Sequence, residues 1–365
     1  MKKKIMTIVG ARPQFIKAGV VSKVLQNKFA NQLEEIIIHT GQHYDTNMSE
    51  VFFEQLKLPH PQKNLNIGSG SHAEQTGTMI IHLEKEMLKK KPDIVLVYGD
   101  TNSTLAGALA ASKIHIPVAH VEAGLRSFNR MMPEEINRIM VDHVSGLLFA
   151  PTNTAVKNLK DEGIQKNVIL TGDVMYDSAL YCAGKAEKNI QFLNKFSIEN
   201  QLESQKFFLA TVHRAENTNN QSKLEQIISA FENLPFKVVW PVHPRMRKIL
   251  EAKPGFKAPN ILFIEPLPYL DMILFLKNCR MVLTDSGGIQ KESLFFNVPC
   301  ITLRDETEWV ETLESGWNLL AGADAQKIQE AILKHDSVPK KDAKKLYGSG
   351  NAGEKILKAT VEFLN

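Results

Sequence analysis

The sequence predicts an α/β protein built from two Rossmann-like, doubly wound domains. Three observations carry this prediction. Short apolar segments alternate with segments of helical spacing, this alternation stops and then restarts, and a length of 365 residues fits about two domains. Continuous apolar strands that alternate with helices indicate parallel sheets covered by helices on both faces.

The first half of the chain contains five expected strands separated by helical segments. The strands are Ile5–Val9, Glu35–Thr40, Ile94–Tyr98, Pro117–Glu122 and Gly146–Ala150. The helices are Ile16–Lys28, Ala73–Lys91, Thr101–Ile114 and Glu134–Ser145. Ser71 is a suitable cap for the second helix, and Pro92 ends it.

The second half repeats this alternation. Its segments are Phe207–Val212, Ser222–Asn233, Lys237–Pro241, Met246–Glu251, Ile261–Glu265, Tyr269–Asn278, Met281–Thr284, Gln290–Phe296 and Cys300–Leu303. We therefore assign residues 1–170 to one domain and 171–351 to the other. The link lies in Thr171–Gln205, with a polar, weakly ordered stretch near Glu187–Gln205, and the final helix, within 352–365, is expected to pack back on the first domain.

Composition narrows the class of function. A formal charge of +4 does not argue for nucleic acid or a membrane surface as partner, and it suits an anionic small substrate. The three cysteines form no CxxC pair, and no apolar run reaches the ~20 residues of a membrane span. We expect a soluble cytoplasmic protein that binds no metal.

The segment 284-TDSGGIQKES-293 is the strongest sign of a binding site. Ser286 ends a buried strand, Gly287 and Gly288 are expected to turn the chain, and a helix is expected to open at Ile289–Phe296. Free backbone N–H groups and the helix dipole both favour an anion there, so we expect a phosphate site. Glu292, further along the helix, is a candidate for holding ribose hydroxyls. The alternative is a glycine turn without a ligand.

The first expected strand ends in 10-GARPQFIK-17, which places Arg12 and Lys17 beyond its carboxyl end. In open α/β sheets ligands bind at that edge, so both cations are candidates for contacts with a diphosphate. The segment is not GxGxxG, and a nicotinamide cofactor is therefore not expected. The alternative is two solvated bases at a helix start.

Carboxylates follow the next strands at the same edge. Asp100 lies in 99-GDTNST-104, Glu122 in 120-HVEAGLR-126, and Glu134 in 130-RMMPEEINR-138. His120 and Glu122 are expected on one side of an extended strand. Carboxyl groups that converge raise one another's pKa, which supplies acid and base at neutral pH. Helix capping, or for Glu122 an ion pair with Arg126, is the alternative explanation.

The second domain repeats the pattern. His213 and Arg214 follow its first strand, where an arginine can bind phosphate and a histidine can transfer a proton. The loop 303-LRDETEWVE-311 is polar and contains Trp309; a plain surface loop is its alternative interpretation. No histidine has partners at metal-ligand spacing.

These motifs, in this order, resemble the non-hydrolysing UDP-N-acetylglucosamine 2-epimerase family across nearly the whole chain. The matching motifs are G-x-R-P-x-x-I-K, G-D-T, H-V-E-A-G-L-R, P-E-E-x-N-R, H-R-x-E-N, D-S-G-G-I-Q-x-E and R-D-x-T-E. The resemblance implies a glycosyltransferase-B-like fold with two Rossmann-like domains facing a cleft, no metal or nicotinamide cofactor, and a homodimer. Its functional positions match Arg12, Lys17, Asp100, Glu122, Glu134, His213, Ser286, Gly287, Gly288 and Glu292.

The resemblance also implies the chemistry. UDP leaves C1 as the C2 proton is removed, a 2-acetamidoglucal forms, and UDP adds back while a proton arrives on the other face. Some family members bind a second UDP-sugar as activator near a Gln-His pair, which Gln42 and His43 match here. Hydrolytic release of N-acetylmannosamine, glycosyl transfer to an acceptor, and silent UDP-sugar sensing stay open as alternatives.

The sequence departs from the commonest family pattern at its sugar-facing motifs. It has RPQFIKA where many members have RPE, RDETEW where they have Arg-Pro after Thr-Glu, and Lys291 in place of an acidic residue. These departures resemble the branch acting on UDP-2,3-diacetamido-2,3-dideoxyglucuronate, a precursor for bacterial surface polysaccharide. The sequence leaves the choice between the two sugars open.

Overall fold

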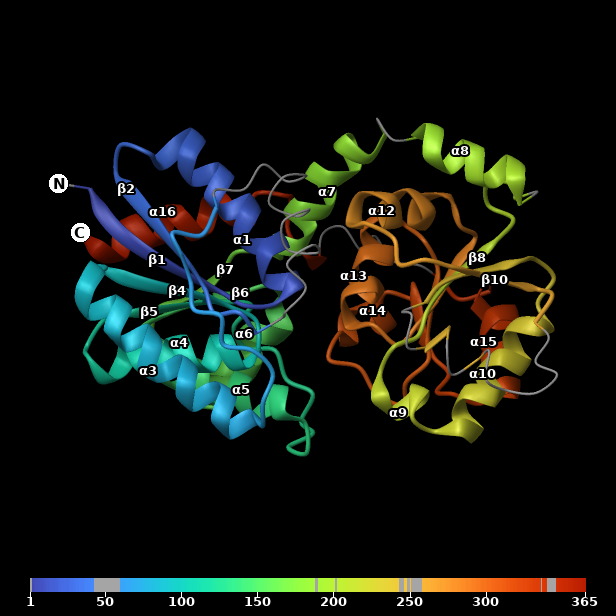
Figure 1. Ribbon diagram of the computed structural model, residues 1–365, viewed down its shortest axis with the longest axis horizontal. Coiled ribbons are helices and arrows are strands. Elements are labelled where there is room, and N and C mark those ends of the chain that lie inside the picture. The colour runs from blue at the N-terminus through green and yellow to red at the C-terminus, as the bar shows by residue number, and fades with distance from the viewer. Residues whose placement is uncertain are drawn as a thin grey trace. The chain divides into compact units, whose positions relative to one another are not determined.

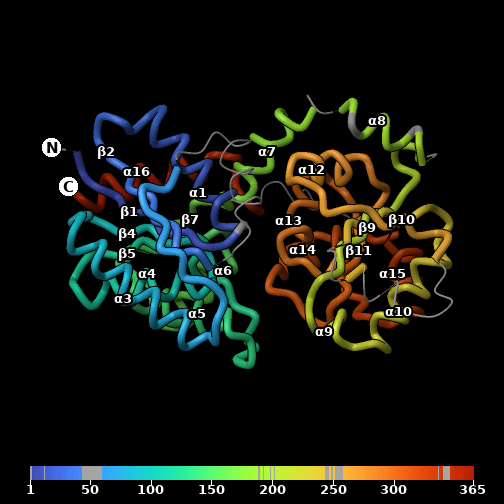
Figure 2. The backbone as a smooth tube through the Cα atoms, viewed as in Figure 1, coloured from blue at the N-terminus to red at the C-terminus, as the bar shows by residue number. Residues whose placement is uncertain are grey.

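The computed structural model describes residues 2–42, 60–187, 190–200, 202–242, 246–247, 250, 258–335, 337–339 and 346–365; the side chains of residues 12, 192 and 198 lie outside this description. The chain divides into two compact units (Figures 1 and 2). The first comprises Met1–Ser178 and Leu346–Asn365, and the second comprises Ala179–Lys345.

The first unit contains a seven-stranded sheet in the order β3-β2-β1-β4-β5-β6-β7. All of its strand pairs are parallel. The strands are β1 (Lys3–Val9), β2 (Leu33–His39), β3 (Lys63–Asn64), β4 (Ile94–Tyr98), β5 (Val118–Val121), β6 (Leu147–Ala150) and β7 (Val168–Leu170). The order reverses between β1 and β4, which makes the carboxyl ends of these two strands the switch point of a doubly wound sheet.

Helices cover both faces of this sheet (Figure 1). They are α1 (Arg12–Val24), which continues into the π-helical η1 (Leu25–Phe29), α3 (His72–Lys90), α4 (Asn102–Lys113), α5 (Pro133–Val144), α6 (Asn153–Asp161) and α16 (Ala352–Leu364). Helix α7 (Val174–Ala186) begins in the first unit and ends in the second. Buried alanines and glycine line α4, so it packs closely between α3 and α5. Apolar residues of one face of the sheet, such as Met6 and Val97, join Met79 and Leu83 of α3 in one core.

The C-terminal helix α16 packs on α1 and β6, within the first unit. Its residues Ile356 and Leu357 are fully buried. The Asp177 carboxylate of α7 accepts a hydrogen bond from the Gly353 N–H, 2.9 Å away, in the first turn of α16. The chain therefore returns to its first unit after completing the second.

The second unit contains a six-stranded parallel sheet in the order β10-β9-β8-β11-β12-β13. Its strands are β8 (Phe208–Thr211), β9 (Val238–Pro241), β10 (Ile261–Ile264), β11 (Met281–Thr284), β12 (Cys300–Thr302) and β13 (Asn318–Leu320). Its helices are α8 (Ile190–Glu199), α9 (Ala215–Thr218), α10 (Gln221–Glu232), α12 (Tyr269–Asn278), α13 (Gly287–Phe295), α14 (Val310–Glu314) and α15 (Ala325–His335). The switch point of this sheet lies between β8 and β11.

Both sheets confirm the predicted fold class. Strands β3, β7 and β13 are not among the expected segments, and one expected segment needs correction. The stretch expected to be weakly ordered near Glu187–Gln205 contains helix α8. Leu193 of this helix is buried, and the ring of Phe196 meets Phe275 of α12 edge-on, with 5.1 Å between ring centroids. These apolar side chains at helical spacing hold the segment on the second unit despite its polar composition.

Candidate active site at the two switch points

The switch point of the first sheet is closed by a glutamine that the sequence analysis gave no role. Gln14 is buried, and its Oε1 accepts the N–H groups of Gly10 at 2.8 Å and Ala11 at 3.0 Å. Its Nε2 donates to the Tyr98 carbonyl at 2.8 Å. The side chain thereby ties the loop after β1 to the loop after β4. A glutamate at this position lacks the donor, so the RPQ form of the motif has a structural meaning here.

Two glycines at this edge are required by close approach. A Cβ on Gly10 would lie 2.1 Å from Ser103 Oγ. Gly99 has φ of +65°, and a Cβ there would lie 3.3 Å from a carboxylate oxygen of Glu122. The backbone therefore passes directly beside the polar groups of the site.

Lys17 and Glu122 form a buried ion pair beside Gly99. Lys17 is 8% exposed and Glu122 is 5% exposed. The expectation that Glu122 lies within an extended strand is wrong, because β5 ends at Val121 and Glu122 has φ of 71°. A left-handed backbone conformation at a residue other than glycine costs about 1–3 kcal/mol of conformational energy. Such strained residues are frequent at functional sites.

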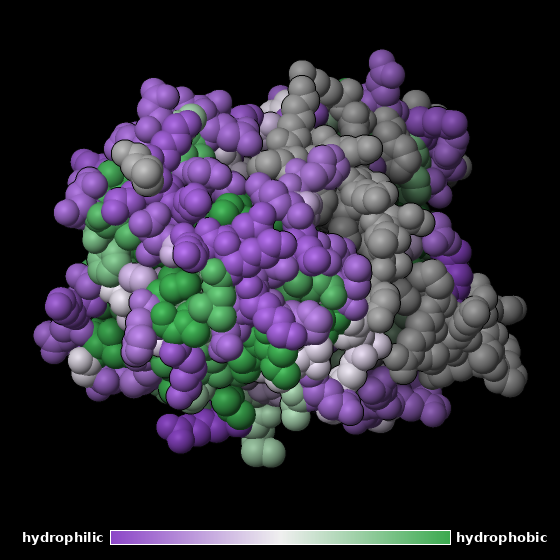
Figure 3. Space-filling model, turned by 60° about the vertical axis from the view of Figure 1, so that its left-hand side comes forward, coloured by the Kyte–Doolittle hydropathy of each residue, from purple (hydrophilic) through white to green (hydrophobic). Residues whose placement is uncertain are grey.

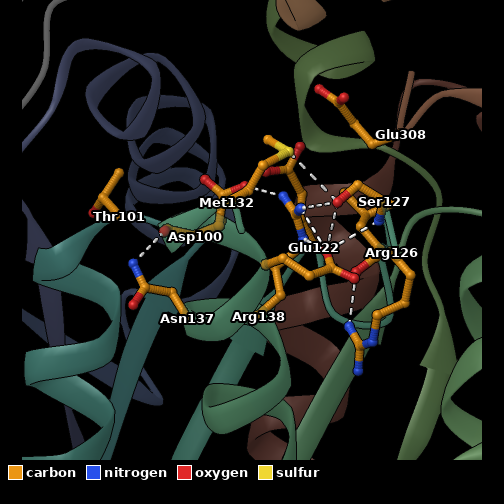
Figure 4. Close-up of polar contacts among 12 residues, drawn as sticks. Asp100, Thr101, Glu122, Arg126, Ser127, Met132, Asn137, Arg138 and Glu308 are labelled. Carbon is orange, nitrogen blue, oxygen red and sulfur yellow. Dashed lines mark hydrogen bonds and ion pairs between the residues drawn. The ribbon is translucent and has the colours of Figure 1, made fainter. Parts of the chain in front are cut away.

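Asp100 follows β4, and its carboxylate is paired with Arg138. Its carboxylate accepts from Arg138 Nη1 of α5 at 2.5 Å (Figure 4), and its side chain keeps 35% of its exposure. Enclosure by protein raises the pKa of Asp100 above its ordinary value. The charges of Arg138 and Lys17 oppose that increase, whereas Glu122 and Glu134 add to it. The carboxyl group is thus set toward proton exchange nearer to neutral pH.

The two neighbouring glutamates at the start of α5 have different surroundings. Glu135 is buried and accepts from Arg138 Nη2 at 2.6 Å and from the Phe128 N–H at 2.9 Å. Burial opposes its ionisation, but hydrogen bonds from Ser127 and Arg138 hold its pKa below its ordinary value. Glu134 is exposed. Of this pair, Glu134 is the one whose carboxylate is accessible to a ligand.

His120 of β5 is buried and connects the loop after β4 to α5. Its Nδ1 lies 2.7 Å from Asp142, and its Nε2 donates to the Gly99 carbonyl at 2.8 Å. Arg126 also contacts Asp142, at 2.7 Å, and its Nε donates to Glu162 at 2.7 Å. The alternative partnership of Glu122 with Arg126 is therefore replaced by the pair with Lys17.

The second switch point is organised by Asp285, another residue whose role the sequence analysis missed. Its carboxylate is fully buried and accepts from the N–H groups of His213 at 3.1 Å and Arg214 at 3.0 Å, and from Asn217 Nδ2 at 3.1 Å. The His213 side chain is 61% exposed. A buried carboxylate thus holds the loop after β8 and leaves the His213 ring at the surface. The position of an aspartate directly after β11 was the available signal.

The start of α13 presents unused donors. Ser286 is the N-cap, and its side chain makes no capping hydrogen bond. In the part of the chain that the structure describes, the N–H groups of Gly287 and Gly288 have no acceptor. The expectation that both glycines form a turn needs correction. They are the first two helical residues, and neither has a positive φ.

The two glycines differ in the space around them. A Cβ on Gly287 would lie 2.4 Å from Glu308 Oε1 and 3.2 Å from Trp309 Nε1. A Cβ on Gly288 would meet only Ser286 Oγ, at 4.0 Å. Gly287 is required by packing. Gly288 faces open space, so packing does not require a glycine there. Glycine within a helix costs about 0.5–1 kcal/mol of stability relative to alanine. We therefore infer that the missing side chain leaves room for a ligand.

The other candidates of this unit are buried in contact with α13. Glu292 is 3% exposed and accepts from Tyr269 Oη at 2.8 Å. The loop after β12 is not a plain surface loop, because Trp309 is 5% exposed and Lys291 Nζ lies 3.7 Å from the centre of its ring. A cation over an aromatic ring stabilises this packing.

The remaining candidates are only partly described. Gln42 Oε1 accepts from the Ser103 N–H at 3.1 Å and Oγ at 2.6 Å, which ties Gln42 to the first turn of α4. His43 and the side chain of Arg12 lie outside the described residues. Among the residues that are described, no group of three or more His, Cys, Asp or Glu is arranged to hold a metal ion.

The fold and the two polar switch points define an α/β protein of the glycosyltransferase-B-like class. The family model described as UDP-N-acetylglucosamine 2-epimerase matches residues 26–360. The chain belongs to this family, a family of isomerases, and the resemblance drawn from the motifs is confirmed.

Relatives match over nearly their whole length. A UDP-N-acetylglucosamine 2-epimerase homolog of Methanococcus maripaludis is 53% identical over 97% of this chain and 98% of that protein. The UDP-2,3-diacetamido-2,3-dideoxy-D-glucuronate 2-epimerase of Pseudomonas aeruginosa is 50% identical over 97% of this chain and 98% of that protein. The crystal structure of Methanocaldococcus jannaschii UDP-GlcNAc 2-epimerase with UDP-GlcNAc and UDP has a TM-score of 0.85 and 43% identity, and covers 99% of this chain and 100% of that one.

Proposed function

We propose that this protein is a non-hydrolysing UDP-sugar 2-epimerase that inverts C2 of a UDP-2-acetamido sugar. The observation that carries the proposal is the polar edge of the first sheet. Asp100 with its raised pKa lies there near the buried Lys17–Glu122 pair. Family membership over residues 26–360 supports the same activity.

The reaction needs a base, an acid and a stabilised leaving group. In the forward direction the C2–H bond breaks, its proton passes to a base, and the C1–O bond breaks with its electron pair leaving on UDP. The 2-acetamidoglucal then takes a proton at C2 on the other face as UDP re-adds at C1. We assign proton transfer to Asp100, Glu122 and Glu134. Lys17 is assigned as the cation paired with Glu122, and His213 as a group that stabilises the leaving group or transfers a proton. The paired cations of Asp100 and Glu122, and the exposure of Glu134 to a ligand, support this assignment.

The second unit supplies the groups expected to bind UDP. We assign the diphosphate to Ser286, Gly287, Gly288 and Arg214, together with Arg12 of the first unit, and the ribose hydroxyls to Glu292. The unpartnered N–H groups at the start of α13 support the diphosphate assignment, because they and the helix dipole stabilise negative charge as it develops on the leaving group.

Two sugars are candidates. UDP-N-acetylglucosamine is supported by the family match. UDP-2,3-diacetamido-2,3-dideoxyglucuronate is supported by 50% identity to the Pseudomonas aeruginosa enzyme named for it. A panel containing both UDP-sugars, followed by NMR, distinguishes them by which one is converted.

Incubation with the UDP-sugar in deuterated water tests the chemistry. Deuterium is expected at C2 of both epimers, because the proton returned to C2 comes from a group that exchanges with solvent. Inversion without label contradicts deprotonation at C2. Free N-acetylmannosamine and UDP as main products indicate a hydrolysing enzyme. Absence of exchange with UDP bound indicates a sensor or a transferase awaiting an acceptor.

We further propose a cytoplasmic homodimer, with Gln42 and His43 as a regulatory pair. All three cysteines are buried, and Cys279 and Cys300 are free thiols, which fits a reducing compartment. Among the described residues, no helix is long and apolar enough to cross a membrane.

An exposed apolar surface supports the dimer. Figure 3 shows hydrophobic residues gathered on the face of the first unit that it brings forward. Exposed large apolar side chains lie on α3, on α5 and in the loop before α5: Ile81, Leu88, Phe128, Met131, Ile136 and Met140. The substitution Leu88→Asp is expected to shift the dimer toward monomer in analytical ultracentrifugation, because a buried unpaired charge disfavours association. An unchanged sedimentation coefficient removes α3 from the interface.

A further inference from the structure

A carboxylate already lies at the expected anion site of the second unit. Glu308 Oε1 is so close to Gly287 that a Cβ on that glycine would be 2.4 Å from it. In a helix the Cα–Cβ direction tilts toward the N-terminus, so Glu308 lies beside the N-terminal end of α13. The unpartnered N–H groups of α13 open at the same end.

Two arginines accompany this carboxylate. Arg304 is 4% exposed, and its Nη1 donates to Glu308 Oε2 at 3.0 Å. The Nε of Arg304 is buried and makes no hydrogen bond among the described residues, and Glu216 Oε1 lies 3.8 Å from it as an ion-pair partner. Arg214 is tied to the same switch point, because its Nε donates to the Asp285 carbonyl at 3.1 Å. Glu308 is therefore held in place by a buried guanidinium at the same switch point as Arg214.

Glu308 carries a negative charge at neutral pH. Burial opposes its ionisation, but Arg304, the backbone and Arg214 together hold the pKa of Glu308 below its ordinary value. Its side chain is 11% exposed, so solvent screens this charge only weakly. A diphosphate bound at α13 therefore meets a fixed negative charge as well as the cations.

We infer that Glu308 makes this site prefer a UDP-sugar over free UDP. The inference rests on the proposed function. In a UDP-sugar both phosphates are esterified and carry one charge each. The terminal phosphate of free UDP takes a further charge with a pKa of about 6, as phosphate monoesters do. A resident carboxylate repels the more highly charged ligand more strongly.

This preference matters for an enzyme that generates UDP within its own reaction. Free UDP shares every nucleotide contact with the substrate and acts as a competitor. The charge of Glu308 weakens the binding of free UDP in particular, while UDP-sugar retains the helix and arginine contacts. Glu308 is therefore a specificity residue.

Calorimetric titration of the full-length protein with UDP and with UDP-N-acetylglucosamine tests this inference. Glu308→Gln keeps the side-chain shape and an acceptor for Arg304 but removes the charge. At pH 8 we expect the affinity for UDP to increase about tenfold and that for the UDP-sugar about threefold. The advantage for UDP is expected to shrink at pH 5.5, where its terminal phosphate loses the additional charge. Glu314→Gln, at an exposed carboxylate on α14, is the control with the same change in net charge.

The outcomes separate this inference from the proposed function. If neither ligand binds the wild-type protein, the proposed function fails. If both bind and Glu308→Gln leaves the ratio of the two affinities unchanged, or weakens UDP more than the UDP-sugar, the inference is overturned. A change in ratio that Glu314→Gln reproduces reflects net charge alone and also overturns it. Thermal unfolding of each variant identifies any loss of affinity caused by misfolding.

Discussion

The two switch points have the same topology and differ in the groups that they present to a ligand. At the first, between β1 and β4, Lys17 pairs with Glu122 and Arg138 pairs with Asp100. At the second, between β8 and β11, the first N–H groups of α13 lack acceptors in the described chain and the His213 ring is exposed. Paired, enclosed carboxyl groups suit proton transfer, whereas open donors suit anion binding. One sheet order thus supports two kinds of chemistry through the side chains at its carboxyl edge.

The largest expected effect separates these two roles. Asp100→Asn and Glu122→Gln are each expected to lower kcat by a factor of about 100 or more, because proton transfer by a positioned group contributes that much. UDP affinity should stay within about threefold, since the UDP contacts are assigned to the second unit and to Arg12, and neither of these carboxyl groups is among them. Steady-state kinetics and calorimetric titration measure the two quantities.

Glu34→Gln, at an exposed carboxylate of β2, is the control for these substitutions. Full activity in either of the two site variants removes that carboxyl group from the assignment. A parallel loss of UDP affinity contradicts the division of labour between the two switch points.

The second expected effect is on the stability of the first unit, at the contact between Asp177 of α7 and the start of α16. Burial raises the pKa of Asp177 to about 6, and the hydrogen bonds from Gly353 and Ala352 only partly offset this increase. Because the folded-state pKa lies above the ordinary value, the protonated form is favoured by folding. The associated stability is present below about pH 4 and is lost as the pH rises through about 6.

Asp177→Asn is therefore expected to gain stability relative to the wild type as the pH rises from 4.5 to 7.5, by about 1–2 kcal/mol. Thermal unfolding of both proteins across this range measures the difference. If one unit unfolds separately, the transition of the first unit should move and that of the second should not. A difference that is constant with pH contradicts the assignment of this titration to Asp177.

The smallest expected effect is on UDP affinity at the second switch point, and it distinguishes Gly288 from Gly287. Gly288→Ala should weaken UDP binding about fivefold, by about 1 kcal/mol, because its methyl group enters the space left beside the donors. It should leave the melting temperature unchanged or raise it, since alanine favours a helix. Gly287→Ala is the matched variant and should lower the melting temperature, because Glu308 and Trp309 fill the space there. Equal behaviour of the two variants contradicts the distinction between packing and ligand space.

The sequence predicted the fold well because its strands are continuous apolar runs between glycine- and proline-containing turns. It predicted the neighbourhoods of Asp100, Glu122 and Ser286 because polar residues after buried strands collect at one edge of a parallel sheet. It did not predict α8, whose apolar positions lie within a polar segment. It also gave no role to Gln14 or Asp285, since their importance comes from hydrogen bonds to residues distant in the chain: Gln14 bonds to Tyr98, and Asp285 to His213 and Arg214.

The sequence by itself determined the alternation of strands and helices, the family, and which motifs stand at the strand ends, because periodicity and local turn chemistry are written along the chain. Only the tertiary structure decided which charges pair. Lys17 meets Glu122 across 105 positions, and a carboxylate reaches Gly287 from position 308. Partner choice depends on distances through space and on burial, which set both pKa and the strength of an ion pair, and neither quantity is encoded in residue spacing.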